Sequence, residues 1–124
     1  MLKKSVPVLL LSLLLAGCAS KVTNLSALHQ QRNANNLYPV EVAFASRQQT
    51  IRWQSIKPYI IAGKEAYEMR PTLLMTNRWE GLIPVPPGVR EVEYRYKLEY
   101  QYNRMGAPGN SSALSSKYVL RILD

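Results

Sequence analysis

The sequence predicts an all-β domain, an antiparallel β-sandwich of about seven short strands. From residue 37 onward, apolar and polar side chains alternate with a period of two, which is typical of half-buried strands. Gly, Pro, Asn and Ser interrupt this pattern at short intervals, and the same stretch lacks the period of an amphipathic helix. The length of 124 residues, 47% of them hydrophobic, allows one small domain with a packed core.

The first residues are expected to form a cleaved signal. Lys3 and Lys4 precede an apolar stretch, residues 6–15, that is shorter than the roughly 20 residues needed by a membrane-spanning helix. A basic start, a short apolar run and small residues at its end are typical of a secretory signal peptide. The stretch closes on Leu15-Ala16-Gly17-Cys18, which resembles the lipobox of bacterial lipoproteins.

This resemblance implies that residues 1–17 are removed and that Cys18 is lipidated. The sulfur would carry a diacylglyceryl group and the new amino group an acyl chain such as palmitate, which together hold a protein stably on a membrane. Ala19 and Ser20 follow, where inner-membrane lipoproteins carry Asp. The resemblance therefore implies the bacterial outer membrane, with the domain in the periplasm or at the cell surface. The alternative is that Cys18 is an ordinary small residue of a cleaved signal.

Residues 18–36 are expected to form the acylated cysteine and a flexible tether. Asn, Gln, Ser and Ala dominate this stretch, which has too little apolar surface to offset its ordering entropy. Fully extended, it would reach on the order of 60 Å. His29 lies here and is interpreted as a solvated linker residue.

The folded domain is expected over residues 37–124. Its first strand, 37–45, alternates Val40, Val42 and Phe44 with more polar positions. In the next, 50–55, Trp53 alternates in phase with Ile51, which favours a core position for this tryptophan.

Weaker strands follow. Pro58 favours extended geometry before an apolar run at 59–61, and Gly63 turns the chain. Residues 66–70 and 72–75 read as weak strands interrupted by Pro71, which belongs on an edge or at a bulge.

The second half of the domain is more regular. A strand at 79–85 ends at the turn Pro86-Pro87-Gly88. Residues 92–102 alternate without interruption, so that one face is expected to be buried and the other wet. Residues 103–116 are expected to be a long loop, and 117–123 a last strand.

This spacing of short strands and turns favours a sandwich of immunoglobulin-like size, with a small barrel as the alternative architecture. One cysteine excludes an internal disulfide, so the core has to hold by packing alone.

Few residues are suited to catalysis. One Cys, one His and one Asp exclude cysteine-based zinc sites and leave almost nothing for catalytic triads or metal clusters. Paired carboxylates are the remaining route, but Glu91, Glu93 and Glu99 share the wet face of one strand with Arg95 and Lys97, where ion pairing explains them. We therefore expect no catalytic residue, no metal and no cofactor besides the lipid on Cys18.

One short stretch resembles starch-binding-type β-sandwich modules. The resemblance rests on Asn77-Arg78-Trp79-Glu80, Ile83-Pro84-Val85-Pro86-Pro87-Gly88 and Glu93-Tyr94-Arg95-Tyr96-Lys97. It implies that Trp79, before the turn, can help to stack a sugar. Tyr102, at the end of its strand, is expected to keep its hydroxyl wet, and it joins Trp79, Arg95 and Lys97 as a candidate contact for a partner or glycan.

Charge points to anionic partners. The formal net charge of +8 becomes +6 when Lys3 and Lys4 are removed with the signal. An envelope location leaves anionic lipid headgroups, acidic glycans or an acidic protein face, and it excludes nucleic acid. A basic soluble surface without a partner is the plain alternative.

Together these observations predict a non-catalytic lipoprotein anchored in the outer membrane. Its tethered domain would act as a binding or scaffolding module, as a subunit or accessory of a cell-envelope protein assembly, because confinement by the lipid raises its effective concentration near a partner. A glycan- or peptidoglycan-binding module is the alternative, and a small envelope hydrolase the remote one.

Overall fold

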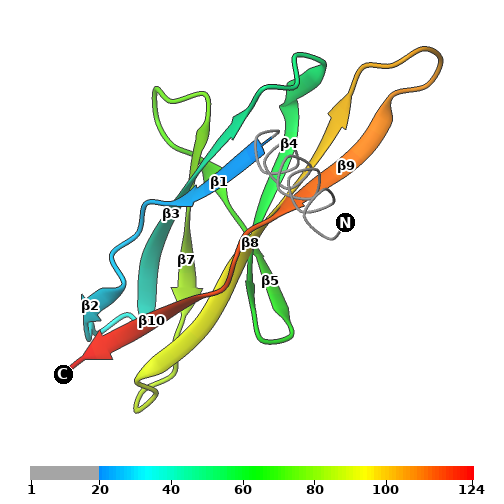
Figure 1. Ribbon diagram of the computed structural model, residues 1–124. Coiled ribbons are helices and arrows are strands. Elements are labelled where there is room, and N and C mark those ends of the chain that lie inside the picture. The colour runs from blue at the N-terminus through cyan, green and yellow to red at the C-terminus, as the bar shows by residue number, and fades with distance from the viewer. Residues whose placement is uncertain (1–19) are drawn as a thin grey trace, which may run out of the picture.

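The structure, a computed structural model, describes residues 20–124 as ten strands with no helix among them (Figure 1). The strands are β1 (Ser20–Asn24), β2 (His29–Gln31), β3 (Leu37–Ser46), β4 (Ile51–Ala62), β5 (Glu65–Glu68), β6 (Arg70–Pro71), β7 (Arg78–Pro84), β8 (Glu91–Tyr102), β9 (Gly109–Leu114) and β10 (Tyr118–Leu123). The predicted signal peptide 1–17 and Cys18 lie outside the described residues.

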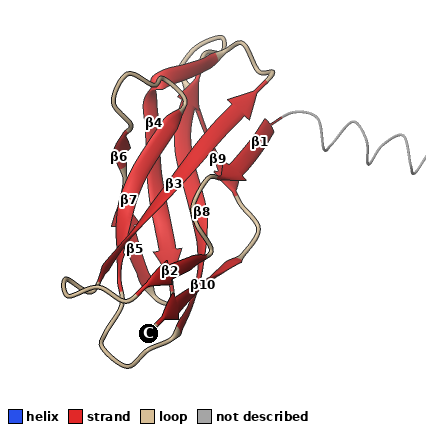
Figure 2. Cartoon of the chain, turned by 90° about the vertical axis from the view of Figure 1, so that its left-hand side faces the viewer, coloured by secondary structure: helices blue, strands red, loops and turns tan. Residues whose placement is uncertain are grey.

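Two sheets pack face to face (Figure 2). One has the order β1-β3-β7-β6, and the other has the order β2-β10-β8-β4-β5, with β9 pairing β8 as well. Every pairing is antiparallel except that of β2 with β10. The orders correspond to the A-B-E-D and C′-C-F-G sheets of immunoglobulin-like sandwiches. The predicted fold class is confirmed, and the barrel alternative is not adopted.

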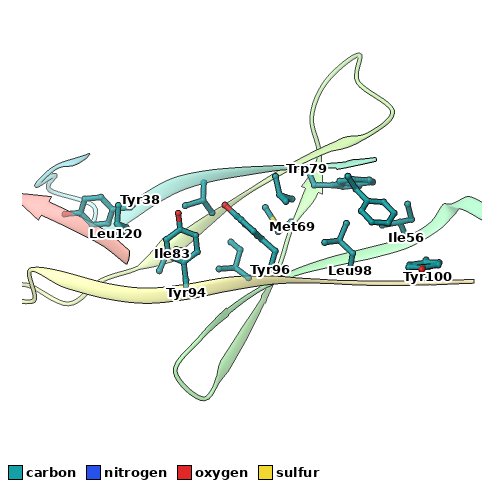
Figure 3. Packing of buried hydrophobic residues seen from close by; sticks show 14 of the residues in the cluster. Tyr38, Ile56, Met69, Trp79, Ile83, Tyr94, Tyr96, Leu98, Tyr100 and Leu120 are labelled. Atoms are coloured by element: carbon teal, nitrogen blue, oxygen red, sulfur yellow. The ribbon is translucent and has the colours of Figure 1, made fainter. Parts of the chain in front are cut away.

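The core fills the space between the two sheets (Figure 3). Strand β8 places one face into this space, as its alternation predicted: Tyr94, Tyr96, Leu98 and Tyr100 are all buried. From the opposite sheet come the buried residues Tyr38, Val40, Val42, Phe44, Trp79 and Ile83. Apolar and aromatic side chains pack between the layers, and hydrogen bonds of Tyr94 and Tyr96 with Asn24 also join the two sheets.

The structure differs from the sequence-based expectation at residues 20–36, which were predicted to be a flexible tether. Strand β1 pairs with β3 from Ser20 opposite Ser46 to Asn24 opposite Val42, and it also contacts β9 of the other sheet. Strand β2 then pairs in parallel with β10. The first strand of the sandwich is thus divided between the two sheets, so the folded unit includes residue 20 and the predicted boundary at 37 is too late.

Hydrogen bonds hold this segment, together with Val22, which packs against the core. The Tyr96 phenol donates to Asn24 Oδ1 at 2.6 Å, and the Asn24 side-chain NH2 group donates to the Tyr94 hydroxyl at 2.9 Å. Ser26 Oγ lies 3.0 Å from the same Tyr96 oxygen and accepts the Glu41 amide at 2.7 Å. Polar side chains that suggested a solvated tether are therefore the groups that fasten it to the core.

A second difference is a bulge in β4. Arg52 pairs with Gln101, and the next paired residues are Lys57 and Glu99. Between these two pairs β4 advances by five residues while β8 advances by two, so β4 has an excess of three residues. An odd excess reverses which face each side chain takes. Trp53 lies in this irregular segment and is 38% exposed, although the alternation with Ile51 predicted a core position. One side of its ring still packs against the buried Phe44, with 5.9 Å between the ring centroids.

The last differences concern residues 72–75 and 103–116. Residues 72–75 form a turn rather than a strand, and Pro71 lies in the edge strand β6, as predicted. Residues 109–114, expected within a long loop, form β9 beside the far half of β8. That half of β8 extends beyond β10, and β9 satisfies the backbone groups that would otherwise be unpaired.

Candidate binding surfaces

Trp79 lies in the core and not at a sugar-binding surface. Strand β7 begins at Arg78, so its alternation turns Trp79 and Ile83 inward, where their exposed fractions are 5% and 0%. Figure 3 shows the indole between the layers at the end that also holds Ile56 and Tyr100. The expectation that Trp79 contacts a glycan or partner is wrong, because such stacking needs an open ring face.

Tyr102 has a packing role. A Cβ built on Gly109 would lie 2.2 Å from Tyr102 Cζ, so the phenol ring covers the backbone of the residue opposite it on β9. This close approach requires glycine at position 109. Tyr102 is half-buried, and its ring holds the start of β9 against the end of β8.

Arg95 braces the junction between β9 and β10. Its Nε and one terminal nitrogen both donate to the Ser115 carbonyl, at 3.1 and 2.8 Å. The Ser115 hydroxyl in turn accepts the Tyr96 amide at 2.8 Å. The guanidinium is therefore used within the domain. Lys97, the remaining candidate, lines a depression that is open to solvent.

That depression is an open groove on the outer face of the second sheet, across β4, β8 and β9. Its volume is about 660 Å³. Its lining residues are Ser55, Lys57, Lys97, Glu99, Tyr100, Gln101, Asn110, Ser111 and Ser112. Hydroxyl, amide and charged groups of both signs dominate the lining, so the groove suits a polar ligand that brings its own donors and acceptors.

The bulge in β4 shapes this groove. Ser55 Oγ accepts the Gln101 amide at 2.8 Å and donates to the Arg52 carbonyl at 2.6 Å, which lets a hydroxyl take the place of a missing backbone partner. Sequence reasoning missed the groove because no pattern in residues 50–62 marks the bulge. The polar run Asn110-Ser111-Ser112 was the one available sign that the stretch beside it is exposed.

Charges in the groove come from both strands. Lys57 lies opposite Glu99 in the register, and Lys97 Nζ is 3.7 Å from Glu99 Oε1. Two lysines and one carboxylate leave a surplus of one positive charge among the lining residues. An anionic or mixed-charge partner segment is favoured by this balance.

Two other carboxylates of β8 form ion pairs on this face. Glu93 lies 3.4 Å from Lys117, and Glu91 lies 3.6 Å from Arg121. These pairs join β8 to β10 and its approach, as the sequence predicted. Residues 20–124 hold no group of three or more potential metal ligands.

No protein-family model matches the chain, and no curated protein matches its sequence significantly. Over the part of the chain that the structure describes, no helix is long and apolar enough to cross a membrane.

Proposed function

We propose that this chain is a non-catalytic lipoprotein of the bacterial outer membrane, anchored through Cys18, whose sandwich is a binding subunit of a cell-envelope protein assembly. The observation that carries the partner proposal is the polar groove over β4, β8 and β9. The anchor rests on the lipobox resemblance of residues 15–18. Both parts are testable separately.

The groove fits a polypeptide segment better than a glycan. Lys57 and Lys97 beside Glu99 offer ion pairs of both signs, and Gln101 and Asn110 offer amides that pair with backbone groups. A sugar site usually adds an exposed aromatic platform, whereas the only ring in the lining, Tyr100, is 9% exposed. Glycan or peptidoglycan binding is therefore the second candidate, supported by the hydroxyls and amides alone.

Strand pairing of residues 20–31 changes how such a subunit would work. A long tether would let the domain search for a partner far from the membrane, but the folded unit already includes Ser20. Only Ala19 lies between Cys18 and Ser20 in the sequence, so the chain between them reaches about 7 Å. An anchored domain would therefore meet partners close to the membrane surface.

The partner is tested by extracting the protein from its own envelope in detergent, with a tag after Asp124. Native size and co-purifying chains are then measured. Lys97→Glu is expected to reduce recovery of a stoichiometric partner by roughly tenfold. Lys64→Glu is the matched control, because it makes the same charge change in the β4–β5 turn, outside the groove.

Each outcome has a consequence. A lone monomer, or equal recovery with both variants, would reject the groove as a protein-docking site. Retention on peptidoglycan or an acidic glycan that Lys97→Glu abolishes would replace the protein partner by the second candidate. Cys18→Ser is expected to release the protein from the membrane fraction, and unchanged retention would reject the anchor.

A further inference from the structure

Three loops gather at one end of the sandwich, called here the loop end: 47–50 between β3 and β4, 72–77 between β6 and β7, and 103–108 between β8 and β9. Figures 1 and 2 both show them at the end opposite the C-terminus. The Asn103 amide donates to the Thr50 carbonyl at 2.8 Å, and Phe44, near the end of β3, donates to the Asn77 carbonyl at 3.0 Å.

The loop end exposes large apolar side chains at its tips. The exposed fractions are 84% for Leu73, 94% for Leu74 and 100% for Met105. Trp53 lies close by in β4, adjacent to the 47–50 loop, and is 38% exposed. Exposed apolar groups at one end of a domain are typical of a site that contacts a partner or a membrane.

The backbone presents the two leucines outward. The Met75 amide donates to the Thr72 carbonyl at 3.1 Å, so Leu73 and Leu74 are the corner residues of a tight turn. Leu74 has φ of 65°, a left-handed conformation that glycine or asparagine adopts far more readily. A leucine at this position gains nothing from burial within the domain, which points to a contact outside it.

Cationic side chains surround these tips. Arg47, Arg52, Arg78 and Arg104 lie in or beside the three loops, and none of them forms an ion pair with a carboxylate of the described residues. Residues 42–64, 69–79 and 100–123 contain no Asp or Glu at all. The opposite end, by contrast, pairs its arginines with Asp124.

The chain enters the described domain beside this end. Ser20 pairs with Ser46, which immediately precedes the 47–50 loop. The lipobox cysteine is two residues earlier in the sequence, within about 7 Å of chain length. A lipid attached there would hold the loop end, and not the C-terminal end, next to the bilayer.

We propose that the loop end rests on a bilayer of anionic phospholipid. Leu73, Leu74 and Met105 enter the interface between headgroups and acyl chains, and the arginines contact the phosphates. Apolar tips surrounded by cations are the combination that binds interfaces of this kind. The apolar tips project from two separate loops, 72–77 and 103–108, which suits a deformable planar surface better than a protein. This orientation rests on the anchor proposed above, because the lipid on Cys18 would hold the loop end close to the bilayer.

The test uses the lipidated protein reconstituted into phosphatidylcholine vesicles with and without phosphatidylglycerol. Leu74→Cys and Met105→Cys receive an environment-sensitive thiol dye, and Leu123→Cys, 42% exposed near the C-terminus, is the matched control. Cys18 is the only native thiol, and its thioether would leave the introduced cysteine as the sole reactive group. We expect blue-shifted, quencher-protected emission at 74 and 105 but not at 123, stronger with the anionic lipid.

The contribution of the arginines to membrane contact is tested with the labelled Leu74→Cys protein. Arg47→Gln and Arg104→Gln are each expected to reduce protection at position 74 about fivefold, and added salt is expected to act in the same direction. Arg90→Gln, at the opposite end, is the control and is expected to change nothing.

The outcomes separate the two proposals. Equal quenching at positions 74 and 123 in vesicles, with Cys18 unreactive, would overturn the membrane-resting loop end while leaving the anchor intact. Protection at 74 in native envelopes but not in vesicles would assign the loop end to a protein instead. Labelling of Cys18 in the unsubstituted protein would reject the anchor itself.

Discussion

The phenol of Tyr96 donates a 2.6 Å hydrogen bond to the side-chain oxygen of Asn24, although 72 positions separate the two residues. The bond joins the first described strand to the strand at the centre of the core. Burial raises the pKa of Tyr96 well above its ordinary value of 10.0, so the phenol keeps its proton and remains a donor at every physiological pH. The start of the described chain is therefore fixed by a pair of neutral groups.

Tyr96→Phe is expected to lower the free energy of unfolding by about 1 to 3 kcal/mol, because it leaves Asn24 Oδ1 without this donor in a half-buried site. Urea unfolding monitored by circular dichroism measures the change. Tyr118→Phe is the control, since no hydrogen bond of that hydroxyl is found within residues 20–124, and it should cost little. Equal effects of the two substitutions would show that the Tyr96–Asn24 bond does not stabilise the fold.

This contact also explains why residues 20–36 were predicted wrongly as a tether. Alternation over 37–124 predicted the sandwich and the inward face of β8, because burial of one sheet face requires that pattern. Asn24 and Ser26 contribute through hydrogen bonds to Tyr96, a residue far away in sequence, and such bonds leave no periodic trace. Polar composition alone indicates low burial, and here that does not mean absence of structure.

Trp79 is expected to behave as a core residue and Trp53 as a partly exposed one, which is the reverse of what the sequence suggested. Trp79→Ala should destabilise the domain by about 3 to 5 kcal/mol through a cavity in the core, whereas Trp53→Ala should cost roughly half as much or less. Acrylamide quenching is expected to reach Trp53, at 38% exposure, far more than Trp79, at 5%. Fluorescence of each single-tryptophan variant checks this, and a strongly quenched Trp79 would contradict the assigned core position.

The reason for this reversal is local. Alternation between Ile51 and Trp53 was correct as a pattern, but the three-residue excess in β4 reverses the faces beyond Arg52. The groove containing Lys97 follows from the same bulge, so neither feature could be obtained from periodicity. Trp79 is in phase with Ile83 in the predicted strand, which indicated burial, but its charged neighbours Arg78 and Glu80 favoured an exposed position beside a turn.

Gly109→Ala is expected to destabilise the protein by about 1 to 3 kcal/mol, because the added methyl would overlap the ring of Tyr102. The effect should depend on that ring. In a Tyr102→Ala background the same substitution is expected to cost much less, and a double-mutant cycle of unfolding free energies measures the difference. Additive costs would show that the ring does not cover position 109.

Acid is expected to weaken the ion pair between Arg32, which follows β2, and Asp124, which follows β10. The Arg32 side chain donates a 2.5 Å hydrogen bond to Asp124, and this bond together with the positive charge lowers the pKa of the Asp124 carboxyl below its ordinary 3.8. Because the pKa of Asp124 is lower in the folded than in the unfolded protein, its ionised carboxylate stabilises the fold above pH 3.8. This stabilisation is lost as the pH falls through the pKa of Asp124 in the folded protein.

Asp124→Asn should therefore lower the thermal midpoint at neutral pH and lose its effect in strong acid. Glu68→Gln is the control, because Glu68 forms no ion pair with any of residues 20–124, and its effect should be small at both pH values. Thermal unfolding of an untagged chain at a series of pH values measures both variants. A difference between the wild type and Asp124→Asn that persists unchanged below pH 3.8 would assign the stabilisation to another group.

Leu74→Asn is expected to raise the stability of the domain and weaken its contact with anionic membranes at the same time. Asparagine tolerates a φ of 65° better than leucine, so relief of backbone strain should contribute up to about 1 kcal/mol, measured by urea unfolding in detergent. The lost apolar side chain should reduce the protection of a dye at position 105 in phosphatidylglycerol vesicles. If Leu74 were retained only for packing, the Leu74→Asn protein would be less stable than the wild type. That result would show that Leu74 supports the fold. Opposite signs for stability and membrane contact are the expected result of a leucine held in an unfavourable conformation for a contact outside the domain.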